Sequence, residues 1–247
     1  MMLTEEQQQR YKRNIMLDDM GKHGQEILLQ SSVLVIGAGG LGSPVILYLA
    51  AAGVGHIGIC DFDKVDISNL QRQIIHTTAD IGREKTISAQ ESVKLLNPDV
   101  EVILHQEKIN AENIQTTIKD YDFIIDATDN FASKFLINDA CVSMQKPYSH
   151  GGINGFNGQV TTVIPKSPCY RCIYGDDFAE EVKEINGVLG AVAAVIGSIQ
   201  ATEAIKYLLD AGGLLSGRLL IYNALKMEFK ELRIRHDDDC SVCSDIK

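Results

Sequence analysis

Residues 33–50, VLVIGAGGLGSPVILYLA, predict a buried strand, a tight turn and a helix in direct succession. The continuous apolar run is typical of a strand that is covered on both faces. Ser43 can cap the helix with Pro44 at its first position, and Gly53 can end it. Such a turn can bind a nucleotide phosphate, because its backbone amides and the helix N-terminus favour negative charge. The turn has the spacing G-x-G-x-x-G, and its candidate nucleotide-binding glycines are Gly37, Gly39, Gly40 and Gly42.

Short apolar runs alternate with helical patterns through most of the chain. Further buried strands are expected at 54–61, 100–104 and 121–127, and helices at 4–30, 83–97, near 111–119 and at 131–144. This alternation predicts an α/β fold, with a doubly wound, mostly parallel, Rossmann-like sheet and helices on both faces.

From residue 159 the pattern changes. Segments 159–164 and 219–235 are typical of antiparallel strands, and one long helix is expected between them at about 190–209. We expect these strands to extend the parallel sheet within a single domain. Its expected parts are an N-terminal helical arm (1–30), a nucleotide-binding region (31–164) and a C-terminal region (165–247).

The formal net charge of −10 argues against nucleic-acid binding, because a phosphate backbone would be repelled. The polar N-terminus lacks the apolar core of a signal peptide, and no apolar run reaches membrane-spanning length. We therefore expect a cytoplasmic protein that binds neither nucleic acid nor membrane, with its six cysteines reduced.

Asp61 stands at the end of the second predicted strand, about 20 residues after the glycines. An acid at this position accepts hydrogen bonds from ribose hydroxyls. The alternative is a packing turn without a ligand. An NAD-dependent oxidoreductase is equally compatible with these features.

The segment DFDKVDISNLQRQ (61–73) adds groups that a dinucleotide site does not need. Asn69, Arg72 and Lys85 can turn toward the glycine turn, and a cluster of this kind suits a triphosphate. The alternative is that Arg72 and Lys85 are solvated surface charges. The same segment supplies two further candidate nucleotide contacts, Asp63 and Gln73.

The sequence DATDN (126–130) follows the strand predicted at 121–127. Residues at the carboxyl ends of parallel strands face the ligand crevice, so Asp126 and Asp129 are placed to hold Mg²⁺. Asn130 is a further candidate nucleotide contact. The alternative is that Asp129 caps the following helix.

Two CxxC pairs are spaced as thiolate ligands of a metal ion. They are Cys169 with Cys172, and Cys240 with Cys243. Four thiolates around one ion make a closed structural zinc site, which would staple the C-terminal tail to the preceding region. Two disulfides or redox pairs are the alternatives. Cys60 and Cys141 are expected to be buried, inert thiols.

The chain resembles the ThiF/MoeB/HesA family, relatives of the ubiquitin-activating enzymes. The resemblance runs from about residue 8 to residue 243 and rests on RYKRN, GAGGLGS, DFDKVDISNLQRQ, DIGREK, DATDN and GSIQATEAIK. It implies an ATP-dependent adenylyltransferase that activates the C-terminal Gly-Gly carboxylate of a ubiquitin-fold sulfur carrier, of thiamin-thiazole or molybdopterin type. Since that carboxylate is already ionised, catalysis reduces to positioning and charge neutralisation, without a general base.

The resemblance also implies roles for individual residues. Asp61 would hold the ribose, and Asp129 would hold Mg²⁺. Arg13, in RYKRN, would reach the triphosphate of a partner chain across a homodimer interface. The phosphates would be contacted by Asn69, Arg72 and Lys85, and the residues implied to be catalytic are Arg13, Arg72, Lys85 and Asp129. The six histidines share no spacing and are interpreted as structural or surface residues.

The chain departs from the family pattern before GVLG, where Lys183 stands at the position of a cysteine found in many of these enzymes. A solvated lysine is a poor nucleophile, so we expect no thioester or acyl-disulfide with the carrier. The enzyme is expected to stop at the acyl-adenylate, with a separate sulfur donor protein and no attached rhodanese domain. The acidic loop 173–187 is expected to pass over the carrier's tail.

Two other functions remain open. An NAD-dependent oxidoreductase would use the glycine turn and Asp61, but would leave SNLQRQ, Lys85 and DATDN unexplained. A non-catalytic scaffold that binds a ubiquitin-fold partner is compatible with the absent cysteine, although the complete set of charged candidates argues against it.

Overall fold

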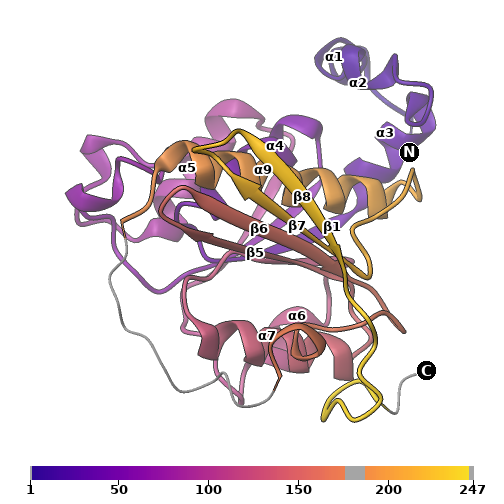
Figure 1. The fold of residues 1–247 in the computed structure, drawn as a ribbon. Coiled ribbons are helices and arrows are strands. Elements are labelled where there is room, and N and C mark those ends of the chain that lie inside the picture. Colours follow the sequence, from indigo (N-terminus) through magenta and orange to yellow (C-terminus); the bar gives the residue numbers. More distant parts are fainter. Residues whose placement is uncertain (1, 176–186, 245–247) are drawn as a thin grey trace.

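A computed structural model describes residues 2–175 and 187–244 of the chain. Within these residues one mixed sheet runs in the order β3-β2-β1-β4-β5-β6-β7-β8 (Figure 1). The strands from β3 to β5 are parallel, and β6, β7 and β8 continue from β5 as antiparallel neighbours. The strands are β1 (Ser32–Ile36), β2 (His56–Cys60), β3 (Glu101–His105), β4 (Phe123–Asp126), β5 (Tyr148–Asn154), β6 (Asn157–Val163), β7 (Arg218–Asn223) and β8 (Glu228–Arg233).

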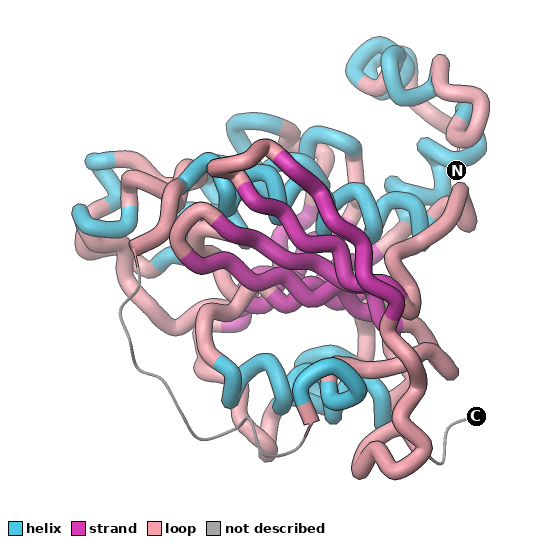
Figure 2. The backbone as a smooth tube through the Cα atoms, in the orientation of Figure 1, coloured by secondary structure: helices cyan, strands magenta, loops and turns pink. Residues whose placement is uncertain are grey.

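Helices cover both faces of the sheet (Figure 2). Helices α4, α5 and α9 lie over one face, and α6 and α7 lie over the other (Figure 1). The helices are α1 (Glu5–Arg10), α2 (Lys12–Ile15), α3 (Gly21–Gln30), α4 (Gly42–Ala52), α5 (Lys85–Leu96), α6 (Ile114–Ile118), α7 (Phe131–Ser143), α8 (Arg171–Tyr174) and α9 (Gly190–Leu208), with 3₁₀ turns η1 (Ile67–Asn69) and η2 (Thr78–Asp80).

Strand β1 shows why its sequence is apolar throughout. Val33 and Val35 belong to the cluster that α4 and α9 cover, and Leu34 and Ile36 belong to the cluster beneath α6 and α7. Successive strand side chains point to opposite faces, so both faces need apolar residues. The predicted doubly wound sheet with helices on both faces is confirmed.

The antiparallel extension is also confirmed. Segment 219–235 forms the β7–β8 hairpin, and α9 precedes it at the predicted place. Strand β8 lies at the sheet edge with all six residues exposed. It has no buried face, which explains why the apolar alternation slips within it.

Several local predictions are wrong. The helix expected at 4–30 is broken into α1, α2 and α3. Strand β3 was expected to be buried, but it lies at the edge of the sheet opposite to β8, and Ile103 is exposed. Helix α4 begins at Gly42 without a side-chain cap, because the Ser43 hydroxyl donates to the carbonyl oxygen of Gly39 instead, at 2.7 Å. Gly53 ends α4 in the left-handed conformation, as predicted.

Candidate active site

The glycine turn lies at the carboxyl ends of β1, β2 and β4, where open α/β sheets bind ligands. Gly37 has a φ of +102°, which favours glycine, and a Cβ atom there would lie 2.7 Å from the carbonyl oxygen of Ala127. A Cβ atom at Gly42 would collide with the carbonyl oxygen of Gly37. Side chains at these two positions would therefore distort the turn.

Asp61 is joined to this turn by hydrogen bonds. One carboxylate oxygen accepts the backbone amide of Ala38 and the other accepts that of Asp63, each at 2.8 Å. The predicted ribose-binding residue therefore lies against the glycine turn, and it also orders the first residues after β2.

The residues after η1 supply further groups to the turn. The Arg72 side chain packs beside Gly40, and its guanidinium donates to the carbonyl oxygen of Ser68 at 3.1 Å. Gln73 is 4% exposed and its amide lies beside Gly39. The Oε1 atom of Gln73 is buried and has no hydrogen-bond partner among the described residues. An unsatisfied buried oxygen at this place fits a site that binds a polar ligand.

Asn69 holds this segment through its backbone. Its carbonyl oxygen accepts the amides of Arg72 and Gln73, both at 3.0 Å. Its side-chain oxygen accepts the amide of Asp66 at 3.3 Å within η1. The structure thus gives Asn69 a role in shaping the segment 66–73, in addition to any contact with a ligand.

Lys85 is the first residue of α5, and its side chain is only 7% exposed. Its ammonium group donates to Asp63 at 2.9 Å, and its backbone amide donates to the Asp63 carbonyl oxygen at 3.0 Å. The cation is therefore held beside the end of β2. The structure brings Lys85, Asp63, Asp61 and the glycine turn together.

The second predicted Mg²⁺ ligand, Asp126, is not available to a metal. Its side chain is fully buried and accepts from the Thr128 hydroxyl at 2.6 Å, His150 Nδ1 at 2.8 Å and Lys134 Nζ at 3.4 Å. Burial would raise the pKa of Asp126, but the Lys134 ammonium and the His150 hydrogen bond hold it well below its usual range. Asp126 is a buried structural anion.

Asp129 is exposed and lies in the short segment between β4 and α7. It does not cap that helix, because the Asn130 side chain does so by accepting the amide of Ser133 at 2.9 Å. The Asn130 amide nitrogen donates to Asp129 at 3.3 Å. Asn130 thus has a structural use that the sequence interpretation missed.

Arg13 lies far from this cluster within its own chain. Asn14, the next residue, donates to the carbonyl oxygen of Ala52 at 3.3 Å, at the C-terminal end of α4. The glycine turn is at the other end of this 11-residue helix, which is about 16 Å long. Arg13 therefore does not reach the glycine turn of its own chain.

The four cysteines of the CxxC pairs converge. Their sulfur atoms all lie within 4.8 Å of one another, with 3.7 Å between Cys169 and Cys240 and 3.4 Å between Cys172 and Cys243. A tetrahedral zinc site with thiolate bonds of about 2.3 Å would separate the sulfurs by about 3.8 Å. The cluster therefore fits a structural metal site and ties the segment after β8 to α8. Cys60 and Cys141 are buried as expected, and burial raises the pKa of Cys60 to about 12.

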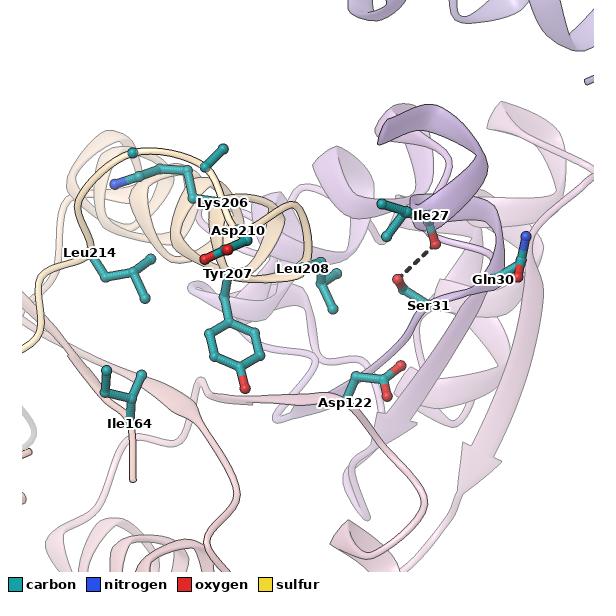
Figure 3. A pocket seen from close by; sticks show the side chains of 12 residues that line it. Ile27, Gln30, Ser31, Asp122, Ile164, Lys206, Tyr207, Leu208, Asp210 and Leu214 are labelled. Atoms are coloured by element: carbon teal, nitrogen blue, oxygen red, sulfur yellow. Dashed lines mark hydrogen bonds between the residues drawn. The ribbon is translucent and has the colours of Figure 1, made fainter. Parts of the chain in front are cut away.

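A cavity of about 630 Å³, drawn in Figure 3, lies where β1 and β4 begin, at the end of these strands opposite the glycine turn. Ser31 and Asp122, which line it, precede β1 and β4. The Ser31 hydroxyl donates to the carbonyl oxygen of Ile27, so it is already satisfied (Figure 3). This cavity is separate from the predicted site at the carboxyl ends of the strands.

Two polar residues near the site, His76 and Lys134, were not predicted as site residues from the sequence. His76 contacts the glycine turn, and the Lys134 ammonium donates to the carbonyl oxygens of Thr128 and Gly151 at 2.7 Å each. His76 follows the segment SNLQRQ and Lys134 follows DATDN, and both segments were already assigned to the site. This proximity in sequence is the signal that could have identified the two residues.

Lys183 lies in 176–186, outside the described residues, and so does most of the loop 173–187. No helix among the described residues is long and apolar enough to cross a membrane.

Curated proteins of similar sequence include the SAMP-activating enzyme E1 of Haloferax volcanii, 45% identical over 241 residues, which cover 96% of this chain and 88% of that protein. The sulfur carrier protein adenylyltransferase of Thermus thermophilus is 42% identical over 251 residues, with 98% and 93% covered. Adenylyltransferase and sulfurtransferase MOCS3 of Culex quinquefasciatus is 45% identical over 241 residues. The match covers 96% of this chain but 55% of MOCS3, so the chain spans about half the length of that relative.

Among solved structures, that of Escherichia coli MccB with ATP has a TM-score of 0.85. The two chains are 22% identical, and the match covers 95% of this chain and 74% of MccB. At this identity the likeness shows a shared fold. The sequence profile of the ThiF family matches residues 11–242, nearly the whole chain. The glycine turn, the polar cluster around it and the four-cysteine site thus lie in a chain that belongs to the ThiF family.

Proposed function

We propose that this chain uses ATP to adenylate the C-terminal Gly-Gly carboxylate of a ubiquitin-fold sulfur carrier, which yields an acyl-adenylate and pyrophosphate. The observation that carries the proposal is the convergence of Lys85, Asp63 and Asp61 on the glycine turn. The similarity to the SAMP-activating enzyme E1 of Haloferax volcanii and to the sulfur carrier protein adenylyltransferase of Thermus thermophilus supports the same activity.

The residue types match the demands of the reaction. The attacking carboxylate is ionised at neutral pH, so the protein must orient it and neutralise charge as pyrophosphate leaves. Lys85 and Arg72 supply positive charge, and Asp61 supplies acceptors for the ribose hydroxyls. Gln73, with its unsatisfied buried oxygen, is a further candidate nucleotide contact beside Asn69, Asp63 and Asn130.

Asp129 is the proposed protein ligand for Mg²⁺. Its side chain is exposed at the carboxyl end of β4 and is free of the capping role that Asn130 takes. Mg²⁺ prefers one or two carboxylates together with phosphate oxygens, and there it would neutralise the departing pyrophosphate. Asp126 is left out of this site because its oxygens are already bonded within the protein.

We further propose a homodimer in which Arg13 of one chain reaches the nucleotide of its partner. The distance of α2 from the glycine turn within one chain supports this arrangement. Zn²⁺ is the proposed occupant of the four-cysteine site, in a structural role. Residues 1–247 would form one adenylation domain, and the sulfur would come from a separate donor protein.

The test is exchange of radiolabelled pyrophosphate into ATP, with ubiquitin-fold carriers supplied one at a time. Exchange that requires one carrier and stops when its last glycine is deleted would support adenylation and identify the carrier, whether thiazole or molybdopterin type. If NAD bound and ATP did not, the proposal would be wrong and the oxidoreductase would take its place. ATP binding without exchange for any carrier would favour the scaffold.

A further inference from the structure

His76 joins the glycine turn to helix α5. The residue is 5% exposed, with Nε2 at 3.0 Å from the carbonyl oxygen of Ala38 and Nδ1 at 2.8 Å from the hydroxyl of Ser88. A carbonyl oxygen only accepts, so Nε2 carries a proton and donates it. In the neutral ring Nδ1 then accepts from Ser88. Burial lowers the pKa of His76, which keeps the ring in this neutral form.

The two contacts of Ala38 hold this residue of the glycine turn through the peptide groups on both of its sides. Its amide donates to Asp61 at 2.8 Å, and its carbonyl oxygen accepts from His76. Gly37 and Gly39 flank this residue and have wide conformational freedom. A turn built of glycines needs outside contacts to hold one shape before the ligand arrives, and such preorganisation increases affinity.

Ser88 connects His76 to the cation of the site. It lies three residues after Lys85 on α5, which is about one helical turn. The imidazole therefore spans the gap between the turn and the helix that begins with Lys85. No other described side chain is shown to bond both elements at once.

We propose that His76 is a positioning residue of the nucleotide site, which sets the glycine turn and the Lys85 helix at the spacing that a nucleotide's phosphates require. This inference rests on the proposed function. It assigns His76 no proton transfer and no contact with the reacting atoms.

The experiment measures ATP affinity calorimetrically in the full chain without a carrier, together with urea unfolding. His76→Phe keeps a ring of similar size and removes both hydrogen bonds. His76→Gln keeps one donor and one acceptor. Ser88→Ala removes the partner of Nδ1, together with the hydrogen bond between the Ser88 hydroxyl and Asp80. The matched control is His105→Phe, since His105 is a partly buried histidine whose Nε2 lies 2.8 Å from the Tyr121 hydroxyl, not against the turn.

We expect His76→Phe to weaken ATP binding about tenfold, the size expected for two lost hydrogen bonds. His76→Gln should stay within about threefold of the unaltered chain, and Ser88→Ala should fall between them. His105→Phe should lower stability without changing ATP affinity. In pyrophosphate exchange the KM for ATP should rise in His76→Phe more than kcat falls.

Three results would overturn the inference in different ways. If the unaltered chain binds ATP and neither His76→Phe nor Ser88→Ala changes the affinity, His76 is a core residue only and the proposed function stands. If the unaltered chain binds no ATP, the proposed function fails and the inference fails with it. Equal loss of ATP affinity in His76→Phe and His105→Phe would also reject a specific role for His76.

Discussion

Lys85 and Asp63 form an ion pair with 2.9 Å between Nζ and Oδ2, although one residue begins α5 and the other follows β2. The pair is asymmetric, because the Lys85 side chain is 7% exposed and that of Asp63 is 51% exposed. In the proposed site, the Lys85 ammonium would exchange this half-exposed partner for a phosphate oxygen. This relationship places the positive charge next to the glycine turn.

Lys85→Gln should reduce carrier-dependent pyrophosphate exchange by about a hundredfold, because a preorganised charge is lost where negative charge develops. The matched control is Lys146→Gln, since Lys146 donates to the carbonyl oxygen of Tyr121 at 2.8 Å, away from the glycine turn. Exchange rates measured at saturating ATP would check this. Equal rates for the two variants would remove Lys85 from the proposed mechanism.

Mixed dimers test the proposed reach of Arg13. Alone, Lys85→Gln should support only about a hundredth of the exchange, and Arg13→Ala should be similarly impaired. If each site combines Lys85 of one chain with Arg13 of its partner, refolding equal amounts of the two variants together should restore about a quarter of the activity, because half of the dimers contain one intact site. An inactive mixture, with heterodimers verified by mass spectrometry, would exclude this arrangement.

Gly42→Ala should abolish nucleotide binding, because the new Cβ atom would collide with the carbonyl oxygen of Gly37 and force the turn open. Gly213→Ala is the control, since the nearest atom to a Cβ at Gly213 is 4.0 Å away and the position is unstrained. ATP-induced changes in melting temperature would report binding in both variants. Retained binding in Gly42→Ala would show that the turn is not needed for the ligand.

Purified chain should contain one zinc ion per chain by elemental analysis. Cys240→Ser should lose it and unfold at lower temperature, because the ion ties the C-terminal segment to α8. Cys60→Ser is the control, since Cys60 lies in β2, outside the cluster. Full zinc content in Cys240→Ser, or none in the unaltered chain, would count against the metal site.

The buried His150 of β5, which lies beside Asp126 at the end of β4, predicts a pH dependence of stability. Burial, together with the nearby Lys134 ammonium, lowers the pKa of His150 to about 4, despite its hydrogen bond to Asp126. The unfolded chain then binds more protons than the folded chain between about pH 6.5 and pH 4. The free energy of unfolding should therefore fall as the pH is lowered through this window, by up to about 3 kcal/mol from His150.

Urea unfolding at pH 7, 6, 5 and 4 would measure this dependence. His150→Gln should show a shallower slope. Part of the remainder is due to His76 and His105, whose pKa values burial also lowers, and part to carboxyl groups such as Asp80, where burial would raise the pKa but hydrogen bonds lower it. His56→Gln, at a partly exposed position, should keep the slope. An unchanged slope in His150→Gln would show that His150 is not the titrating group.

The sequence by itself determined the local elements of this protein and the kinds of chemistry it can hold. Apolar runs such as 33–36 predict buried strands because both faces of a parallel sheet are covered. The glycine spacing and the CxxC pairs are visible without coordinates, because each depends on a few neighbouring residues. The choice of Lys85, Asp61 and Asp63 as site residues also came from segments next to recognisable turns.

Only the tertiary structure decided which polar side chains near the site are free to bind a ligand and which are bonded within the protein. Asp126 and Asp129 look equivalent in DATDN, but packing of α7 and β5 surrounds Asp126 with Lys134 and His150 and leaves Asp129 exposed. His76 carries no motif, and its importance depends on its lying between Ala38 and Ser88. Such relationships join residues far apart in the chain, and burial determines their energies. Periodicity and spacing along one sequence contain neither kind of information.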